Sequence, residues 1–235
     1  MSYPKSAEPS ADVRRVLAIA AHPDDIDFGA AGTIARWTKA GVEVTYCLVT
    51  RGDSGGFDDT PRDRMPAIRE AEQRAAAAAV GVTDVRFLDG YVDGAVYVTH
   101  ELRRDLTRVI RQVRPQRVVA PAIERDYSRL GTTHPDHKAV GEAAFAAIYP
   151  DARNPFAHPE LGLPPWTVSE LWLMDAPNPD FVVDITDTLD AKIAALRSHV
   201  SQLPDPDAME ARVRERAAIL GSDRAAETFV VLRTR

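Results

Sequence analysis

Short apolar runs alternate along the chain with longer segments in which apolar residues recur every three or four positions. Six apolar runs predict buried strands, at residues 16–20, 42–50, 85–88, 117–120, 171–174 and 229–232. The longer segments predict helices, at residues 29–40, 68–80, 99–113, 135–148, 189–200 and 207–220. The clearest is 99–113, where Leu102, Leu106 and Val109 fall on one helical face. Strands that alternate with helices are typical of βαβ units.

This order of elements predicts an α/β fold with a single doubly wound, mostly parallel sheet of Rossmann-like type and helices on both faces. One catalytic domain is expected over residues 13–235, because a chain of 235 residues buries enough surface to fold without a disulfide or a metal. Residues 1–12 are polar and are expected to form a flexible arm. Residues 51–66 combine three glycines with several charges, which predicts a loop that is mobile without ligand and binds substrate.

Composition narrows the class of protein. The 29 basic and 35 acidic residues give a net charge of −6, so binding to nucleic acid through bulk positive charge is not expected. No stretch approaches 18 consecutive apolar residues, so no membrane span is expected. The start of the chain lacks the apolar segment of a secretory signal, and Cys47 is the single cysteine. These features predict a cytoplasmic protein.

Two related tetrads carry the candidate chemistry: His-Pro-Asp-Asp at residues 22–25 and His-Pro-Asp-His at residues 134–137. Each follows a predicted strand and opens a predicted helix. Proline in second place favours an extended histidine before it and suits the first turn of a helix. The strands before the tetrads are the first and the fourth, and in a Rossmann-type order these flank the point where open α/β sheets bind ligands. We therefore expect both tetrads in one crevice.

Two histidines and one carboxylate form a three-ligand zinc site whose fourth position is open to water. His22, Asp25 and His137 could supply this set, and Asp24, His134 and Asp136 would then lie close to the metal without binding it. A carboxylate beside such a site can act as a general base, and a histidine can stabilise an oxyanion or protonate a leaving amine. The inventory suits metal-assisted hydrolysis of an amide.

The tetrads also have simpler interpretations. Asp24 and Asp25 could only favour a helix N-terminus through the helix dipole, and His134 and His137 could be surface residues of a first turn. His-Pro-Glu at residues 158–160 lies in a proline-rich loop without a flanking strand, so we do not assign it to the site. The occurrence of both tetrads at strand-to-helix junctions favours a functional role.

With these residues in place, the chain resembles the LmbE/PIG-L family of zinc-dependent N-acetylglucosamine deacetylases. The similarity is co-linear over about residues 14–202. It rests on Ala-His-Pro-Asp-Asp at 21–25, Gly29, Gly-Thr at 32–33, Thr-Arg-Gly-Asp at 50–53, Arg-Glu-Ala-Glu at 69–72, Phe-Leu at 87–88, Asp-Gly at 93–94, the second tetrad, Asp-Ile-Thr at 184–186, Lys192 and His-Val-Ser-Gln at 199–202. The two tetrads in this order are the specific part of the signal.

The resemblance implies one Zn²⁺ per chain bound by His22, Asp25 and His137, with another divalent metal as the alternative. It also implies that residues next to these ligands act on the substrate. Asp24 matches the general base, and His134 matches the histidine that stabilises the oxyanion or acts as general acid.

Asp136 matches the carboxylate associated with that histidine. Arg69, Asp93 and Asp53 match positions expected to bind the substrate, although Arg69 could also be a cation on a helix surface.

The sequence departs from the family pattern at three points. Asp27 stands where a glutamate is usual two positions after the aspartate pair. Thr132 stands where some members have a tyrosine as an oxyanion donor, and Tyr127 is a speculative substitute. The segment 29–32 has less glycine than is usual and lacks the spacing of a dinucleotide-binding loop.

We therefore expect a metal-dependent amidohydrolase that removes an N-acyl group, most simply acetyl, from a glucosamine-type sugar conjugate. Its partner is a small amino-sugar substrate, and assembly into a homo-oligomer is compatible with the sequence. One alternative is a metal-dependent phosphoesterase that uses Arg51 as a clamp. Another is a non-catalytic sugar-binding protein with a structural metal. The acyl group and the rest of the conjugate are left open by the sequence.

Overall fold

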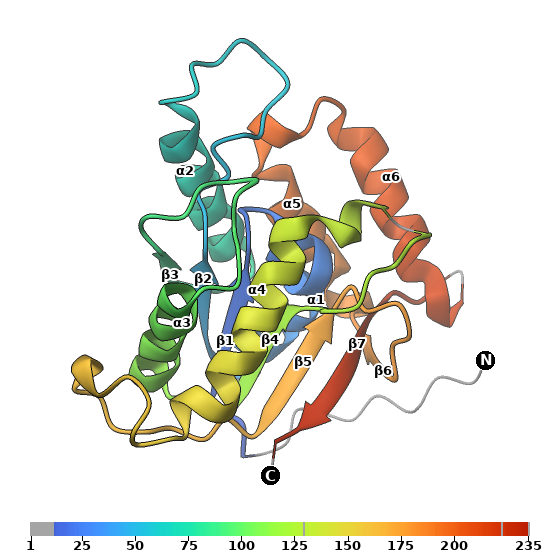
Figure 1. The fold of residues 1–235 in the computed structure, drawn as a ribbon. Helices are drawn as coiled ribbons and strands as arrows, with labels where there is room; N and C mark the ends of the chain where they lie inside the picture. Colours follow the sequence, from blue (N-terminus) through green and yellow to red (C-terminus); the bar gives the residue numbers. More distant parts are fainter. Residues whose placement is uncertain (1–11, 129, 222, 235) are drawn as a thin grey trace.

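Seven strands form a single mixed sheet in the order β3-β2-β1-β4-β5-β7-β6 (Figure 1). The structure is a computed structural model that describes residues 12–128, 130–221 and 223–234. The strands are β1 (Arg15–Ala20), β2 (Glu43–Leu48), β3 (Asp84–Phe87), β4 (Arg117–Pro121), β5 (Glu170–Met174), β6 (Phe181–Asp184) and β7 (Ala226–Arg233). Strands β1 to β5 are parallel, and β7 runs antiparallel to both β5 and β6.

Helices cover both faces of this sheet (Figure 1). The α-helices are α1 (Asp25–Lys39), α2 (Met65–Ala79), α3 (His100–Val113), α4 (Pro135–Ala146), α5 (Leu189–Arg197) and α6 (Pro206–Ala217). The doubly wound, mostly parallel α/β fold predicted from the sequence is confirmed. The boundaries of the predicted domain, residues 13–235, stay a prediction, and the predicted arm at residues 1–12 lies outside the described residues except for Asp12.

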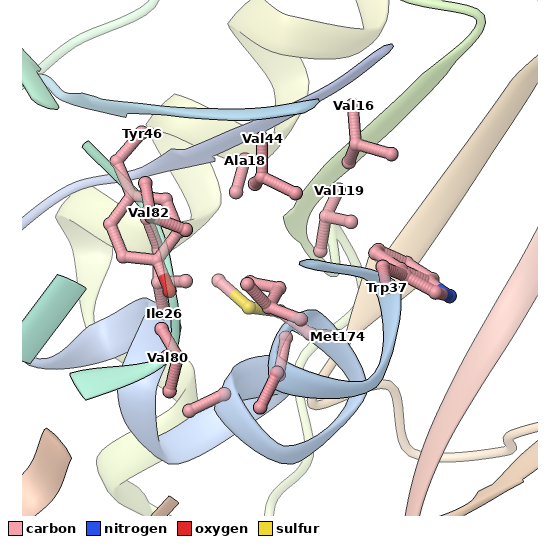
Figure 2. Close-up of a cluster of buried hydrophobic side chains, with 14 of the residues drawn as sticks. Val16, Ala18, Ile26, Trp37, Val44, Tyr46, Val80, Val82, Val119 and Met174 are labelled. Carbon is pink, nitrogen blue, oxygen red and sulfur yellow. The ribbon is translucent and has the colours of Figure 1, made fainter. Parts of the chain in front are cut away.

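Alternation along the strands divides the core into two layers. In β1, Val16 and Ala18 belong to the cluster under α1, whereas Leu17 and Ile19 belong to the cluster under α3 and α4. Successive side chains of a strand point to opposite faces, so a strand buried on both faces is apolar throughout. Figure 2 shows part of the first layer, with Trp37 of α1 among the labelled side chains.

The sheet order decides where the tetrads meet. Strands β1 and β4 are neighbours, with Leu17 opposite Val118. The chain leaves β1 toward β2 on one side and leaves β4 toward β5 on the other. The carboxyl ends of β1 and β4 therefore flank the break in strand order, and both tetrads begin at that edge.

The structure differs from the sequence-based prediction by one additional strand and by several element boundaries, such as the start of α2 at Met65 and the end of α5 at Arg197. Strand β6 was not predicted, because it has only four residues and follows a proline-containing turn. Helix α1 begins at Asp25 rather than at residue 29, because Asp25 and Asp27 interrupt the apolar periodicity at its start. Strand β7 begins at Ala226 rather than at residue 229, since its buried Glu227 breaks the apolar pattern that identifies a strand. Glu227 accepts the backbone N–H groups of Gly32 and Thr33 of α1.

Among the residues that the structure describes, no helix combines the length and the apolar character needed to cross a membrane.

Candidate metal centre and active site

Three donor groups from the two tetrads face one another. His22 Nδ1 lies 3.3 Å from His137 Nε2 and 3.5 Å from Asp25 Oδ2, and His137 Nε2 lies 3.0 Å from Asp25 Oδ1. Zinc binds nitrogen and oxygen ligands at about 2.0–2.2 Å, so a tetrahedral ion keeps its ligand atoms roughly 3.3–3.6 Å apart. Both distances from His22 lie within this range and the distance from His137 to Asp25 is 0.3 Å below it, so the types and the approximate spacing of these donors suit a zinc ion.

The other nitrogen of His22 is held by two carboxylates. His22 Nε2 lies 3.0 Å from Asp93 Oδ1 and 3.1 Å from Asp136 Oδ2. Carboxylates accept hydrogen bonds, so Nε2 carries a proton, and Nδ1, which faces His137 and Asp25, is the nitrogen that a metal could take from a proton. A metal-binding histidine commonly donates its second N–H in this way.

The electrostatics of the centre favour a positive charge. Burial alone would lower the pKa of His22, but hydrogen bonds to Asp136, Asp25 and Asp93 raise it to about 12. Burial lowers the pKa of His137, but the charge and hydrogen bond of Asp25 raise it above its ordinary value. Burial raises the pKa of Asp25, but His137 and His22 lower it more and hold it well below its ordinary value. A group of carboxylates that draws protons onto imidazoles also attracts a divalent cation.

Asp24 lies directly before α1 in a left-handed backbone conformation, with φ 89° and ψ −29°. Its Oδ2 accepts a hydrogen bond from Arg69 Nη2 at 3.1 Å. Burial raises the pKa of Asp24 to about 6, although the Arg69 guanidinium opposes this rise. A carboxylate with a pKa near neutrality can take up a proton during a reaction and release it afterwards.

His134 is the residue before α4, and Pro135 occupies the first turn of that helix. Its Nδ1 accepts the backbone N–H of Asp136 at 3.3 Å. The neutral ring then carries its proton on Nε2 and can donate it. Burial, followed by the charges of His22 and His137, lowers the pKa of His134 and keeps the ring neutral. The ligand atoms of His22, His134 and His137 all lie within 4.8 Å of one another, but this tautomer makes His134 a donor rather than a ligand.

The side chain of Asp136 contacts His22 and not the ring of His134, in contrast to the pairing implied by the resemblance. Its Oδ2 accepts the N–H of Gly94 at 2.7 Å and its Oδ1 accepts the N–H of Val96 at 3.2 Å. These backbone groups hold the carboxylate, which is 1% exposed, beneath His22. Asp136 therefore orients a residue of the metal centre.

The three residues expected to bind substrate all take part in contacts within the protein. Arg69 is buried and donates to the carbonyl groups of Gly52 and Pro23 as well as to Asp24. Gly52 has a φ of 64°, and a side chain there would collide with the Arg69 guanidinium. Asp93 contacts His22, and the Asp93 N–H donates to Asp53 Oδ1 at 3.1 Å. Asp53 therefore connects the loop after β2 to the loop after β3.

A pocket of about 720 Å³ opens beside the metal centre. Its lining includes Asp25 and His137 and, from α6, Val213 and Arg216. Sequence reasoning did not assign α6 to the site, because nothing in the sequence of the helix indicates which loops it faces.

Thr132 lines this pocket, whereas Tyr127 is 89% exposed and does not. The substitution of Tyr127 for the missing tyrosine is therefore not seen in this structure. The mobility of the 51–66 loop stays a prediction.

Arg51, the cation on which the phosphoesterase alternative depended, contacts other groups of the protein. Its guanidinium pairs with Glu70 and Asp89 and donates to the carbonyl of Leu88. An arginine held in this way is not placed to clamp a phosphoryl group.

A buried polar network beneath the tetrads was also missed. Gln73 Oε1 accepts the N–H of Asp24 at 2.9 Å, and Gln73 Nε2 donates to Asp27 Oδ2 at 2.8 Å. His199 Nε2 lies 2.8 Å from the same oxygen. One signal could have identified Gln73: it follows Arg69 by four residues and therefore lies on the same face of α2.

The sequence and the fold of this chain are similar to those of known proteins. The family described as PIG-L: GlcNAc-PI de-N-acetylase matches residues 17–148. The diacetylchitobiose deacetylase of Thermococcus kodakarensis is 33% identical over 204 residues, which cover 86% of this chain and 74% of that protein. A probable N-acetyl-alpha-D-glucosaminyl L-malate deacetylase 2 of Bacillus cereus is 31% identical over 196 residues, covering 80% of this chain and 84% of that protein.

A solved structure of N,N'-diacetylchitobiose deacetylase from Pyrococcus horikoshii, in complex with its inhibitor MPG, superposes with a TM-score of 0.86. Its sequence is 32% identical, and the match covers 94% of this chain and 85% of that chain. The family match spans more than half of the 235 residues and includes both tetrads. The protein therefore belongs to the PIG-L family of de-N-acetylases.

Proposed function

We propose that this protein is a metal-dependent hydrolase that removes the N-acetyl group from a glucosamine-type sugar conjugate. One observation carries the proposal: donor atoms of His22, Asp25 and His137 lie 3.0–3.5 Å apart, with Asp24 next to them in the chain. The relatives of this chain are named as deacetylases of N-acetylglucosamine-type compounds, which supports the same reaction here.

One Zn²⁺ per chain, bound by His22, Asp25 and His137, is part of the proposal. When bound, zinc polarises an amide carbonyl and lowers the pKa of a water molecule, which makes both partners of the hydrolysis more reactive. The orientation of the His22 ring supports this role, since Nδ1 faces the other two donors while Nε2 is held by Asp93 and Asp136.

The protein side chains manage the protons of the reaction. Asp24 accepts a proton from the attacking water while the water oxygen bonds to the carbonyl carbon. His134 donates a hydrogen bond from Nε2 to the oxygen that gains negative charge. Asp24 then gives the proton it took from water to the leaving nitrogen, the C–N bond breaks, and the amine and acetic acid leave, the acid ionising to acetate.

The sugar and the group attached to it are expected to bind to different parts of the site. We propose that Asp93 and Asp53 contact sugar hydroxyl groups, and that Arg69 acts on the substrate through Asp24. The pocket between the metal centre and α6 has room for the rest of the conjugate. Location in the cytoplasm and assembly into a homo-oligomer stay predictions.

The test is an assay for acetate released from N,N'-diacetylchitobiose and from N-acetylglucosamine linked to malate or to inositol. The protein is stripped with a chelator and then reloaded with zinc. We expect release from at least one compound only after reloading. If no compound releases acetate while the zinc-loaded protein hydrolyses p-nitrophenyl phosphate, the phosphoesterase alternative replaces this proposal. If the zinc-loaded protein hydrolyses none of these compounds and still binds an amino sugar, the non-catalytic alternative replaces this proposal.

A further inference from the structure

The backbone of Asp24 has a conformation that residues with a side chain rarely adopt. Its φ of 89° lies in the left-handed region, where steric overlap of Cβ with the backbone disfavours residues other than glycine, although aspartate and asparagine less than most. Strained residues of this kind persist only where surrounding contacts hold them. The contacts of Asp24 therefore decide the direction in which its carboxylate leaves the chain.

Two side chains of α2 hold Asp24, each at a different point. Arg69 holds the carboxylate, through Oδ2, and the carbonyl of the preceding Pro23. Gln73 holds the backbone, since its Oε1 accepts the Asp24 N–H at 2.9 Å. This N–H precedes α1, so the helix offers it no acceptor.

The orientation of the Gln73 amide is itself fixed. Its Nε2 donates to Asp27 Oδ2 at 2.8 Å, and a carboxylate oxygen accepts but cannot donate. Oε1 must then face Asp24. Gln73 and Asp27 are both 0% exposed, so water does not replace either partner.

His199 keeps Asp27 in place from the opposite side. Its Nε2 lies 2.8 Å from Asp27 Oδ2, and its side chain is 1% exposed. The contacts thus run from His199 through Asp27 and Gln73 to the backbone of Asp24, and they join α1, α2 and the segment after α5.

We propose that Gln73 is a positioning residue for deacetylation: it keeps Asp24 in its left-handed conformation and so keeps the carboxylate in the place where it receives a proton. The inference rests on the proposed function, in which Asp24 is the general base. Because Gln73 acts only through Asp24, its substitution should affect catalysis only while Asp24 is present.

The test is a double-mutant cycle in the zinc-loaded enzyme. Gln73→Met keeps the length of the side chain and removes both hydrogen bonds, and Gln73→Asn keeps the amide but shortens its reach. In the wild-type background we expect kcat to fall at least tenfold, with KM and zinc content within twofold of wild type. In the Asp24→Asn background the same substitutions should change kcat less than twofold, because the residue they position no longer acts.

Gln112→Met is the matched control, since Gln112 is an exposed residue of α3. It should leave kcat unchanged in both backgrounds. An equal loss of kcat in the two backgrounds would mean that Gln73 only supports the fold, and it would overturn the inference. If Gln73→Met does not fold, Gln73→Asn carries the same comparison.

A second measurement does not depend on activity. Hydrogen exchange of the Asp24 amide, followed by NMR in zinc-loaded protein, should accelerate in Gln73→Met at least tenfold more than exchange of the Ile19 amide in the core strand β1, which reports on global unfolding. Unchanged exchange overturns the inference whatever the activity. If exchange accelerates in Gln73→Met but the wild-type enzyme releases no acetate, Gln73 anchors Asp24 and the proposed function is wrong. Failure of this inference can therefore be told apart from failure of the proposed function.

Discussion

His22 and Asp136 are 114 positions apart in the chain, and their Nε2 and Oδ2 atoms lie 3.1 Å apart. The contact brings together the segment after β1 and the first turn of α4. It also includes a third segment, because Asp136 accepts the N–H groups of Gly94 and Val96. Asp136 and Asp93 therefore hold Nε2 of His22 together and leave Nδ1 for the proposed metal.

Asp136→Asn should weaken zinc binding. An asparagine offers one acceptor oxygen where Asp136 uses two, so at least one of the three N–H groups that it accepts loses this acceptor, and if that group is His22 Nε2, Asp93 alone holds the ring. Changes at partners of metal ligands cost about 10–100-fold in metal affinity. Competition with a chromophoric chelator measures the Kd. Asp207→Asn, at a position whose side chain is 90% exposed, is the control. A wild-type Kd in the Asp136 variant would contradict this role.

Purified protein should contain about one zinc ion per chain, and removing it should lower stability as well as activity. Free zinc at 100 times its Kd stabilises the folded state by about 2.7 kcal/mol. For a chain of this size that corresponds to a rise in Tm of roughly 5–10 °C. Elemental analysis and differential scanning calorimetry, before and after chelation, measure both effects. An active preparation without metal would refute the metal dependence.

The adjacent carboxylates Asp24 and Asp25 should respond differently to the same substitution. Asp25→Asn replaces a charged ligand oxygen by a neutral amide and should deplete the metal. Asp24→Asn should keep the metal and lose about 10²–10⁴ in kcat, the range for a positioned general base. Zinc content and kcat of both variants decide the matter. If the two variants behave alike, the division of roles is wrong.

Arg216 should select substrates that carry an acidic group. Two other cations that line the pocket are engaged: Lys192 with Glu227, and Lys138 with backbone carbonyls. Arg216 forms no ion pair within the described part of the chain. For an N-acetylglucosamine conjugate with a carboxylate, Arg216→Glu should raise KM by roughly tenfold or more, because a charge-assisted hydrogen bond is lost.

The same substitution should change KM for the uncharged N,N'-diacetylchitobiose less than threefold. Arg212→Glu, which changes an exposed residue of the same helix outside the pocket, is the matched control. Equal effects of Arg216→Glu on the KM of both substrates would show that Arg216 does not distinguish acidic from uncharged substrates.

Asp184 should make stability depend on acid pH. Burial alone would raise its pKa, but hydrogen bonds from Thr186 and the Arg224 guanidinium lower it to about 2. Because the unfolded pKa is near 3.9, the stabilisation is fully present above about pH 4 and disappears as the pH falls through 2. Both partners are partly exposed, so Asp184→Asn should cost only about 1 kcal/mol at pH 7.

Urea unfolding from pH 7 down to pH 2 measures the difference between wild type and Asp184→Asn. The difference should shrink toward zero in acid. Asp187→Asn, at a nearby exposed position, should show no such dependence. A constant difference across this range would exclude the ion pair and hydrogen bonds as its cause.

Local sequence signals were enough to predict the position of the two tetrads. Apolar runs identified β1 and β4, and the proline after His134 marked the start of α4, whereas α1 begins two residues after Pro23. Parallel strands end at a common edge, and the strand order predicted for this fold makes β1 and β4 neighbours at that edge. The juxtaposition of His22 with His137 therefore follows from the sequence pattern and from topology.

The partners of individual polar side chains were decided only by the tertiary structure. The sequence could not show that Asp136 contacts His22 instead of His134, or that Gln73 holds the Asp24 backbone. It also gave no sign that α6 lines the pocket. Apolar periodicity reports which face of an element is buried, because burial depends on composition along that face. A hydrogen bond depends on distances of a few tenths of an ångström between segments that only the packed fold brings together.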